Sequence, residues 1–416
     1  SNLFRYEGRR QAASRLIDLR HFNQPLYLDP SAGTLDVQGL TTFEDIVDFT
    51  LPHGLVPVIT PELKHITIGG ATVGIGIETN SFRYGFVHDS LLEADVLLPH
   101  GEVVTAAANN EYADLFHGLP NSYGTLGYIL RAKIKLHPVK PYVLLTTERY
   151  HSINMLVAAM DKASKNPRYD YLESMAYAAD ELYLTTVRHT DQPQNLKSIY
   201  GPNIFYRQIS QTGIISLRIK DYMFRYDPEW FWALPDSGFY QLFRRFAPKS
   251  MRNSGFYARS AALQGKLAAK LPFIPGEDEN LELLIQDWEV PWKHAEALLS
   301  FAFDNLDLAG RPLMSAPVKT PGLATSYPMD KNQPYLNLGS YSFVKKQPGK
   351  PAYHSTKIMD KFTFAHDGIK MLYSTTFLSE AEFKRIYNDA TYRKLKAKYD
   401  PNKLLPTLYE KTVKAY

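Results

Sequence analysis

The amino-acid sequence predicts an α+β protein with two domains. At 416 residues the chain exceeds the length at which one hydrophobic core usually stops growing. Up to about residue 145, short strand patterns and short helix patterns alternate. After Pro138 and Pro141 the segments become longer and richer in aromatic residues. We therefore expect one domain at residues 1–145, a second at 146–370, and a carboxy-terminal segment at 371–416 that packs back on the first domain.

Composition and charge exclude several classes of site. The chain has 44% hydrophobic residues and a formal net charge of +4, and it has no apolar run of about 18 residues that predicts a membrane span or signal peptide. It contains no cysteine, so disulfides, thiolate metal sites and cysteine nucleophiles are excluded. The twelve histidines lack metal-ligand spacing, so no metal is expected. An intracellular location, cytoplasmic or at a membrane surface, suits this composition.

The first elements follow from local patterns. Apolar residues predict short strands at residues 16–22 and 35–37. Thr41 followed by Glu44 is a capping-box pattern, which predicts that a helix begins here. Residues 55–59 then predict a buried strand. This alternation is typical of an α+β domain.

A glycine-rich segment at residues 68–85 is the most informative part of the sequence. Glycine lacks a Cβ and tolerates positive φ, so its backbone N–H groups can approach an anionic or planar ligand closely. The spacing matches neither a P-loop nor a Rossmann fingerprint. A nucleotide cofactor is one interpretation, and a tight turn within a β-domain is the other. The glycines are Gly69, Gly70, Gly74, Gly76 and Gly85.

Two further motifs follow the glycine segment. Residues 88–105 predict two strands around a turn at Pro99–Gly101. Residues 122–129 are again spaced by glycine, and residues 130–136 alternate apolar and basic side chains. That alternation predicts a strand with its basic residues on one face.

The order of these motifs resembles the FAD-binding domain of the vanillyl-alcohol-oxidase and MurB-like flavoproteins, the PCMH-type fold. Within that group it is most similar to the delta-24 sterol (24-dehydrocholesterol) reductase branch. The resemblance extends to residues 222–227, 335–341 and 370–373. It implies a two-domain fold in which an α+β substrate cap, built on an antiparallel sheet, covers the FAD domain.

The resemblance also implies how FAD would be held. No histidine in residues 1–10 corresponds to the one that bonds flavin covalently in many relatives, so the cofactor is expected to be non-covalent. The chain opens where the first diphosphate-binding loop of the family ends, so an upstream segment, which could carry a membrane anchor, is expected. The FAD contacts implied are Ser1, Asn2, Gly69, Gly70, Ala71, Thr72, Gly74, Gly76, Ser81, Tyr84, Gly124, Thr125, Gly127 and Ile129.

By resemblance, the expected reaction is reduction of a carbon–carbon double bond of a sterol or isoprenoid lipid, with electrons from NADPH. Such chemistry needs a proton donor opposite the flavin. Asp287 and Glu289 share one face of a strand, although an exposed strand face would give the same pattern. As an alternative to a catalytic role, Arg225 could form an ion pair with Asp221 or Asp227. The alternative for Tyr335 and Tyr373 is that they are aromatic residues of the hydrophobic core. The catalytic candidates are Glu78, Arg225, Asp287, Glu289, Tyr335, Asn337 and Tyr373.

Several cap and tail elements are expected from periodicity. Residues 152–164 predict a helix and residues 281–290 a strand. Residues 379–399 have helical spacing, with one apolar side expected to pack against the FAD domain. That side contains Phe383, Ile386, Tyr387 and Leu395.

A basic region lies within the expected cap. Residues 237–276 contain seven Lys and Arg, many aromatic residues and no Asp or Glu. This composition suits contact with an anionic membrane surface. A solvated basic face is the alternative, and no nucleic-acid-binding motif accompanies the region.

Two rival functions fit the same motifs. One is an FAD-dependent oxidase or dehydrogenase that acts on an alcohol or sugar. The other is a non-catalytic lipid- or membrane-binding protein on the same fold, because motifs of the flavin domain specify the cofactor better than the reaction.

Overall fold

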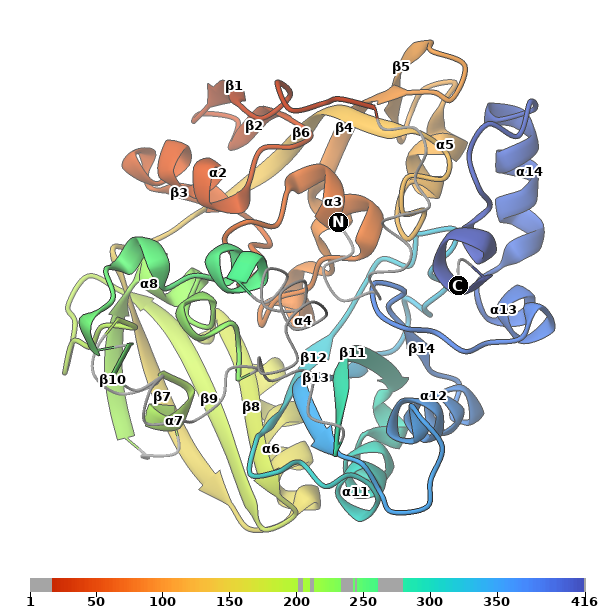
Figure 1. The fold of residues 1–416 in the computed structure, drawn as a ribbon. Helices are drawn as coiled ribbons and strands as arrows, with labels where there is room; N and C mark the ends of the chain where they lie inside the picture. The colour runs from red at the N-terminus through yellow and green to blue at the C-terminus, as the bar shows by residue number, and fades with distance from the viewer. Residues whose placement is uncertain are drawn as a thin grey trace.

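The computed structural model describes residues 17–200, 205–209, 213–232, 242–243, 245–260 and 280–414. Within these ranges the chain forms two antiparallel sheets surrounded by helices (Figure 1), so the predicted α+β class is confirmed. Across the described ranges, no helix has both the length and the apolar character needed to span a membrane. Ser1, Asn2 and most of the basic region 237–276 lie outside the described residues.

The amino-terminal sheet has the order β1-β2-β6-β4-β5, and β3 also pairs with β6. The paired strands β4 and β5 confirm the two strands predicted around Pro99–Gly101. Along β6, apolar side chains are buried while Arg131, Lys133 and Lys135 are less buried, as the alternation predicted. The strands are β1 (Pro25–Asp29), β2 (Thr34–Gln38), β3 (Leu55–Pro57), β4 (Leu91–Leu97), β5 (Val103–Ala107) and β6 (Tyr128–Pro138).

Two local expectations in this region are wrong. Residues 17–22 form loop and turn instead of a strand, because the carboxylate of Asp18 accepts the Arg20 N–H at 3.1 Å and closes a local turn. Helix α2 (Phe43–Thr50) uses Thr42 as its N-cap, one residue later than the capping-box pattern indicated. The buried Thr41 instead accepts the Ile68 N–H through its carbonyl.

The glycine-rich segment folds as a short helix, α3 (Ile68–Gly74). The hydroxyl of Thr67 caps it by accepting the Gly70 N–H at 3.2 Å, and Ile75 ends it with a φ of 59°. Helix α4 (Ser81–Tyr84) follows, and α5 (Ala113–Gly118) lies beyond β5. In Figure 1, α3 and α4 lie between the two sheets.

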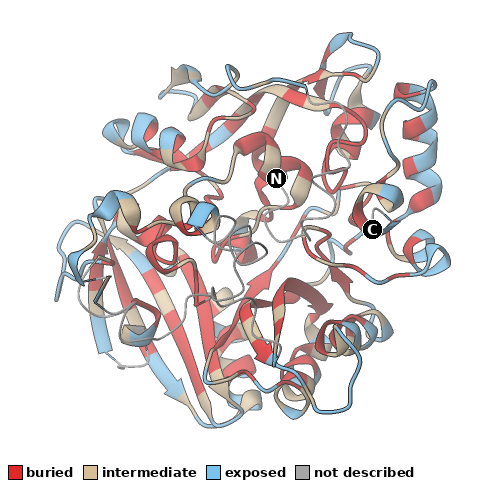
Figure 2. Cartoon of the chain, in the orientation of Figure 1, coloured by how far each residue is buried: buried red, intermediate tan, exposed pale blue. Residues whose placement is uncertain are grey.

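The second sheet has the order β10-β7-β9-β8-β12-β13-β11-β14. Its strand β11 confirms the strand predicted at residues 281–290. Figure 2 shows that its central strands are largely buried. The strands are β7 (Tyr142–Tyr150), β8 (Tyr171–Ala178), β9 (Glu181–Thr190), β10 (Gly213–Arg218), β11 (Leu281–Pro291), β12 (Leu313–Val318), β13 (Tyr335–Lys345) and β14 (Ile369–Lys370).

Three helices cover one face of this sheet: α6 (Ile153–Ser164), α11 (Ala295–Asn305) and α12 (His354–Ala365). Helix α6 confirms the helix predicted at residues 152–164. Together with Leu284 and Trp288 of β11, these helices form a separate hydrophobic cluster. Since side chains alternate along a strand, Asp287 and Glu289 lie on the opposite face of β11. Short helices α7 (Phe205–Ile209) and α8 (Ile219–Met223) flank β10.

The tail forms two helices where one was expected: α13 (Glu380–Ile386) and α14 (Asp389–Tyr399). The helix is interrupted at Asn388, because its φ of 50° is left-handed and cannot continue a right-handed helix. Phe383, Tyr387 and Leu395 are buried. Helix α14 packs beside α5 (Figure 1). We keep the division at 1–145, 146–370 and 371–416 as a proposal.

Candidate active site

Two carboxyl groups lie on the face of β11 that turns away from the helices. Asp287 and Glu289 are 3% and 0% exposed, so the alternative of a solvent-exposed strand face is excluded. In the pairing of β11 with β13, Asp287 lies opposite Gly339 and Glu289 lies opposite Asn337. Because β13 is antiparallel, the odd-numbered residues of both strands share this face.

Asp287 is held by three hydrogen bonds. Its Oδ1 accepts from the Asn337 amide at 2.9 Å and from the Tyr341 hydroxyl at 2.6 Å, and its Oδ2 accepts from the Tyr373 hydroxyl at 2.6 Å. A Cβ at Gly339 would lie 2.5 Å from the Tyr341 hydroxyl, so only glycine there lets this tyrosine reach Asp287. Burial raises the pKa of Asp287, and the three hydrogen bonds oppose that shift.

Glu289 is in a different state from Asp287. Its Oε2 accepts a hydrogen bond from the Tyr327 hydroxyl, while its buried Oε1 has no hydrogen-bond partner among the described residues. Burial and then the neighbouring charge of Asp287 raise the pKa of Glu289 well above its ordinary value. Burial therefore favours the protonated form of this carboxyl group relative to that of an exposed glutamate, and one oxygen is available to a ligand.

Arg225 is the centre of a second buried group, the Arg225 cluster, which comprises Arg225, Glu62, Glu78 and Glu173. The Arg225 Nη2 lies 2.9 Å from Glu62, 3.1 Å from Glu78 and 2.7 Å from Glu173. The alternative in which Arg225 pairs with Asp221 or Asp227 is wrong. Asp227 instead accepts the Lys64 N–H and the Ser254 hydroxyl.

Glu78 joins this cluster to the glycine segment, because it lies between α3 and α4. The Thr79 N–H and hydroxyl both donate to its Oε1 at 2.7 Å. Its Oε2 is buried and has no partner among the described residues. Burial raises the pKa of Glu78 and of Glu62, and mutual repulsion between the two carboxylates adds to the shift at Glu62.

The Arg225 cluster and the β11 carboxyl groups belong to one polar layer. The Arg225 guanidinium lies 4.8 Å from the Tyr226 ring centroid, and the Tyr226 ring stacks on Phe231. Phe231 in turn stacks on Tyr341 at 4.2 Å, and Tyr341 donates to Asp287. The layer thus joins Glu78, which lies between α3 and α4, to residues on strands β8, β11 and β13 of the second sheet.

The glycines of α3 differ in what surrounds them. A Cβ at Gly69 would lie 2.7 Å from the Gly39 carbonyl oxygen, and one at Gly76 would lie 2.6 Å from Val87. At Gly74 the nearest atom would be 3.7 Å away, in the ring of Tyr123. Gly69 and Gly76 therefore allow close packing within the protein, while Gly74 has room for a Cβ in ordinary contact with Tyr123.

The other predicted cofactor contacts have local partners of varied kinds. Thr72 donates to the Ile68 carbonyl at 2.8 Å, the Ser81 hydroxyl accepts the Glu78 N–H at 3.1 Å, and the Tyr84 ring contacts His137. Gly70 is capped by Thr67, and Ala71 is buried in α3. Gly124 and Gly127 have positive φ in the turn that also contains Thr125, and Ile129 begins the buried face of β6.

The residues fit a flavin cofactor on one further observation. Three buried polar atoms of the layer have no hydrogen-bond partner among the described residues: Glu78 Oε2, Glu289 Oε1 and Asn337 Oδ1. A buried polar group normally has a hydrogen-bond partner, so this concentration indicates a polar ligand. No three His, Cys, Asp or Glu of the described residues are arranged to hold a metal ion.

The structure brings together Glu78 with Arg225, and Asp287 with Asn337 and Tyr373. Tyr335 is not hydrogen-bonded to this group of residues, and its hydroxyl instead accepts the Asp330 N–H at 2.9 Å. Sequence reasoning missed Glu62, Glu173, Tyr327 and Tyr341. Two signals were present: Tyr341 lies four residues after Asn337 and so shares its strand face, and Glu173 is a charged residue in a strand whose other residues are uncharged.

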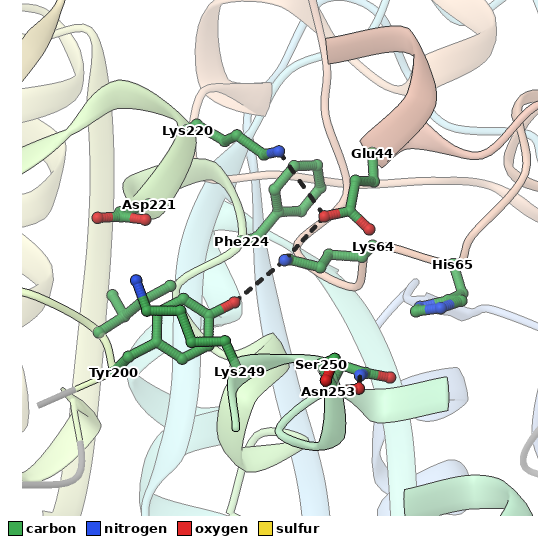
Figure 3. Close-up of a pocket in the computed structure, with 11 residues that line it drawn as sticks. Glu44, Lys64, His65, Tyr200, Lys220, Asp221, Phe224, Lys249, Ser250 and Asn253 are labelled. Carbon is green, nitrogen blue, oxygen red and sulfur yellow. Dashed lines mark hydrogen bonds and ion pairs between the residues drawn. The ribbon is translucent and has the colours of Figure 1, made fainter. Parts of the chain in front are cut away.

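A pocket of about 490 Å³ opens beside the Arg225 cluster (Figure 3). The Lys64 amine lies 2.9 Å from Glu44 and 3.1 Å from the Tyr200 hydroxyl, and Lys220 also approaches Glu44. Three lysines and two carboxylates line it, so its charge is slightly positive. The lining residues are Glu44, Lys64, His65, Ile199, Tyr200, Lys220, Asp221, Phe224, Lys249, Ser250 and Asn253.

Two substitutions within α3 should separate packing from cofactor contact. Gly69→Ala should lower the free energy of unfolding by about 1–3 kcal/mol, because its Cβ meets a backbone carbonyl. Gly74→Ala should leave the stability of the cofactor-free protein unchanged or slightly higher, since alanine favours helix. Urea unfolding and FAD titration of both variants measure this. Equal FAD affinity of Gly74→Ala and the parent protein would contradict a ligand at Gly74.

Comparisons with known proteins show similarity to FAD-binding proteins and to reductases. Residues 2–107 match the model of an FAD binding domain. The chain is 26% identical to a Delta(24)-sterol reductase of Homo sapiens over 94% of this chain and 76% of the relative. It is 30% identical to the Pisum sativum Delta(24)-sterol reductase over 44% of this chain and 34% of the relative. A cytokinin dehydrogenase of Oryza sativa subsp. japonica is 30% identical over 41% and 33%. The resemblance to the FAD-binding flavoproteins is thus confirmed.

Proposed function

We propose that this chain, an FAD-dependent oxidoreductase, reduces a carbon–carbon double bond of a sterol or isoprenoid lipid with electrons from NADPH. The observation that carries the proposal is the state of Glu289. This carboxyl group is buried, its protonated form is favoured by that burial, and it has one oxygen without a partner among the described residues. The names of the relatives support the same substrate class.

In the proposed mechanism the residues hold FAD and deliver a proton. The segment from Gly69 to Gly76 and the turn with Gly124 and Gly127 would hold the cofactor. When bound, FAD supplies the hydride for such a reduction. Glu289 gives a proton to one carbon of the double bond as the hydride reaches the other, which saturates the bond, and Glu289 then regains a proton from solvent.

The remaining polar residues have positioning roles in this proposal. Tyr341 and Tyr373 both donate to Asp287, and the negative charge of Asp287 helps to keep the Glu289 carboxyl protonated. Burial raises the pKa of both tyrosines well above the ordinary value, and Asp287 adds to the shift, so they remain hydrogen-bond donors and are poor acids. Glu289 is therefore the proton donor we assign.

The lysine-lined pocket supports NADPH as the electron donor. Two residues that line this pocket are sequence neighbours of the Arg225 cluster. Phe224 precedes Arg225, and Lys64 lies two residues after Glu62. The lysines of the pocket suit the phosphate groups of a dinucleotide. We propose that NADPH approaches the flavin from this side.

Anaerobic absorption spectroscopy tests this function. NADPH should bleach the spectrum of the FAD-loaded protein, and a sterol with a side-chain double bond should restore it. The rival reaction, oxidation of an alcohol or sugar, predicts bleaching by those compounds and none by NADPH. Because the chain is similar to a cytokinin dehydrogenase, a cytokinin is the third compound to test for bleaching in the same assay. Restoration by sterol is the outcome that the proposal requires.

We also propose a peripheral membrane contact through residues 237–276. In its described part, the side chains of Leu242 and Phe246 are 59% and 74% exposed, next to the cationic Arg245 and Lys249. Exposed apolar and basic side chains together suit an anionic bilayer surface, where a lipid substrate would be available. Sedimentation with vesicles that contain anionic lipid measures this contact, and its dependence on lipid charge is the expected result.

A further inference from the structure

The carboxy-terminal tail contacts the turn at residues 121–127 through a set of buried hydrogen bonds. The Lys396 amine donates to the Thr125 carbonyl at 2.7 Å, and the Tyr392 hydroxyl donates to the Thr125 side chain at 2.8 Å. The Lys411 amine donates to the Tyr123 carbonyl at 2.6 Å. Three tail residues therefore hold the backbone and one side chain of a turn that is more than 260 residues away in the sequence.

The turn has a backbone that needs such support. Asn121, Tyr123, Gly124 and Gly127 all have positive φ, and the values for Asn121 and Tyr123 are 59° and 50°. A left-handed conformation is unfavourable for a bulky residue such as tyrosine and persists only where surrounding contacts hold it. Within the turn, the Thr125 hydroxyl also donates to the Ser122 carbonyl. The hydrogen bonds from the tail therefore stabilise a conformation that is unfavourable by itself.

The turn is connected directly to the glycine helix α3. The Tyr123 N–H donates to the Val73 carbonyl at 3.1 Å, and its hydroxyl donates to the Gly74 carbonyl at 3.3 Å. Tyr123 is also the residue that lies nearest to the open side of Gly74. A shift of the turn would therefore move the wall beside Gly74.

The tail is itself fixed by contacts that do not involve the turn. Asp400 pairs with Lys396 at 2.6 Å and accepts the Leu404 and Leu405 N–H groups. The Tyr392 hydroxyl accepts the Leu408 N–H. Lys398 pairs with Asp114 of α5. Lys396 thus connects a rigid corner of the tail to Thr125.

We propose that the tail, residues 389–413, positions the 121–127 turn for cofactor binding and thereby sets the affinity for FAD. This inference rests on the proposal that Gly124, Thr125 and Gly127 contact FAD. Lys396, Tyr392 and Lys411 are positioning residues, since they act through the turn. Without them the turn spends part of its time in other conformations. The apparent FAD affinity then falls in proportion to the fraction of molecules whose turn is binding-competent.

FAD titration by fluorescence quenching tests the proposal with matched variants. Tyr392→Phe removes one hydroxyl and should raise the FAD Kd about threefold to tenfold, the loss expected for one hydrogen bond. Lys396→Met should raise it by more than tenfold. Lys394→Met is the control, because Lys394 is exposed on the same helix and loses the same charge. Unchanged Kd values for Tyr392→Phe and Lys396→Met would overturn the proposal.

A second measurement covers the case in which Lys396→Met fails to fold. Coupling between two sites is reciprocal, so FAD binding to the parent protein should slow amide hydrogen exchange in residues 389–413. Saturation with FAD without added protection of the tail would overturn the proposal. Failure of the parent protein to bind FAD at all would instead refute the FAD contacts assigned to the turn.

Discussion

Replacing Glu289 with glutamine should slow reduction of the double bond by about 10²–10⁴-fold, the usual contribution of a general acid. Glutamine keeps the size of the side chain and the hydrogen bond to Tyr327, but it has no acidic proton. NADPH should still bleach the FAD-loaded variant at the rate of the parent protein, because that half-reaction does not use Glu289. Stopped-flow absorption measures the two half-reactions separately.

Glu282→Gln is the matched control for this prediction. Glu282 is also a buried glutamate of β11, but its parity places it on the helix-facing side of the strand, where it accepts the Ser355 and Thr356 N–H groups. This variant should be less stable and should retain the rate of substrate reduction. Equal loss in both variants would mean that Glu289 supports the fold and does not supply a proton.

The pH dependence of the same step has a definite sign. Burial raises the folded-state pKa of Glu289, so its acidic form persists to a higher pH than that of an exposed glutamate and disappears as the pH rises through the raised value. The rate of substrate reduction should therefore fall on the alkaline side, and Glu289→Gln should lack that fall. The free energy of unfolding should also fall as the pH rises. Above the unfolded-state pKa, the folded state binds more protons at Glu289 than the unfolded state does.

Replacing Arg225 with methionine should have the largest effect on stability, a loss of about 3–5 kcal/mol in the free energy of unfolding. The guanidinium is 0% exposed and contacts three buried carboxylates, which the substitution would leave without a cation. Glu62 and Glu78, whose pKa values are already raised by burial, would then take up protons more readily. The deficit should therefore shrink as the pH falls from 8 towards 5. Urea unfolding at several pH values measures this.

Arg131→Met provides a comparison that differs mainly in burial. Arg131 also contacts three carboxylates, Asp36, Glu93 and Asp95, but its side chain is 22% exposed and its partners reach solvent. Solvent screens such pairs, so we expect a loss of only about 1 kcal/mol. Similar losses for the two arginines would show that burial does not control the cost.

The sequence was informative where local spacing controls the structure. The glycine segment and the strand pair after it indicated the FAD-binding domain, and the period of two in residues 281–290 put Asp287 and Glu289 on one face. Local spacing could not decide whether that face is exposed. It is buried because the cap sheet has helices on one side and the glycine helix region on the other, which no pattern within β11 records.

Arg225 shows what only the tertiary structure decided. Its nearest carboxylates in the sequence are Asp221 and Asp227, yet its partners lie 163, 147 and 52 residues away, at Glu62, Glu78 and Glu173. Strand period is fixed by the chain's own geometry over a few residues, so the sequence by itself determined the shared face, while the cofactor class came from the resemblance of the motif order to the FAD-binding flavoproteins. Ion-pair partners and proton occupancy depend on which distant segments are buried together, because desolvation sets their energies, and these were decided by the fold.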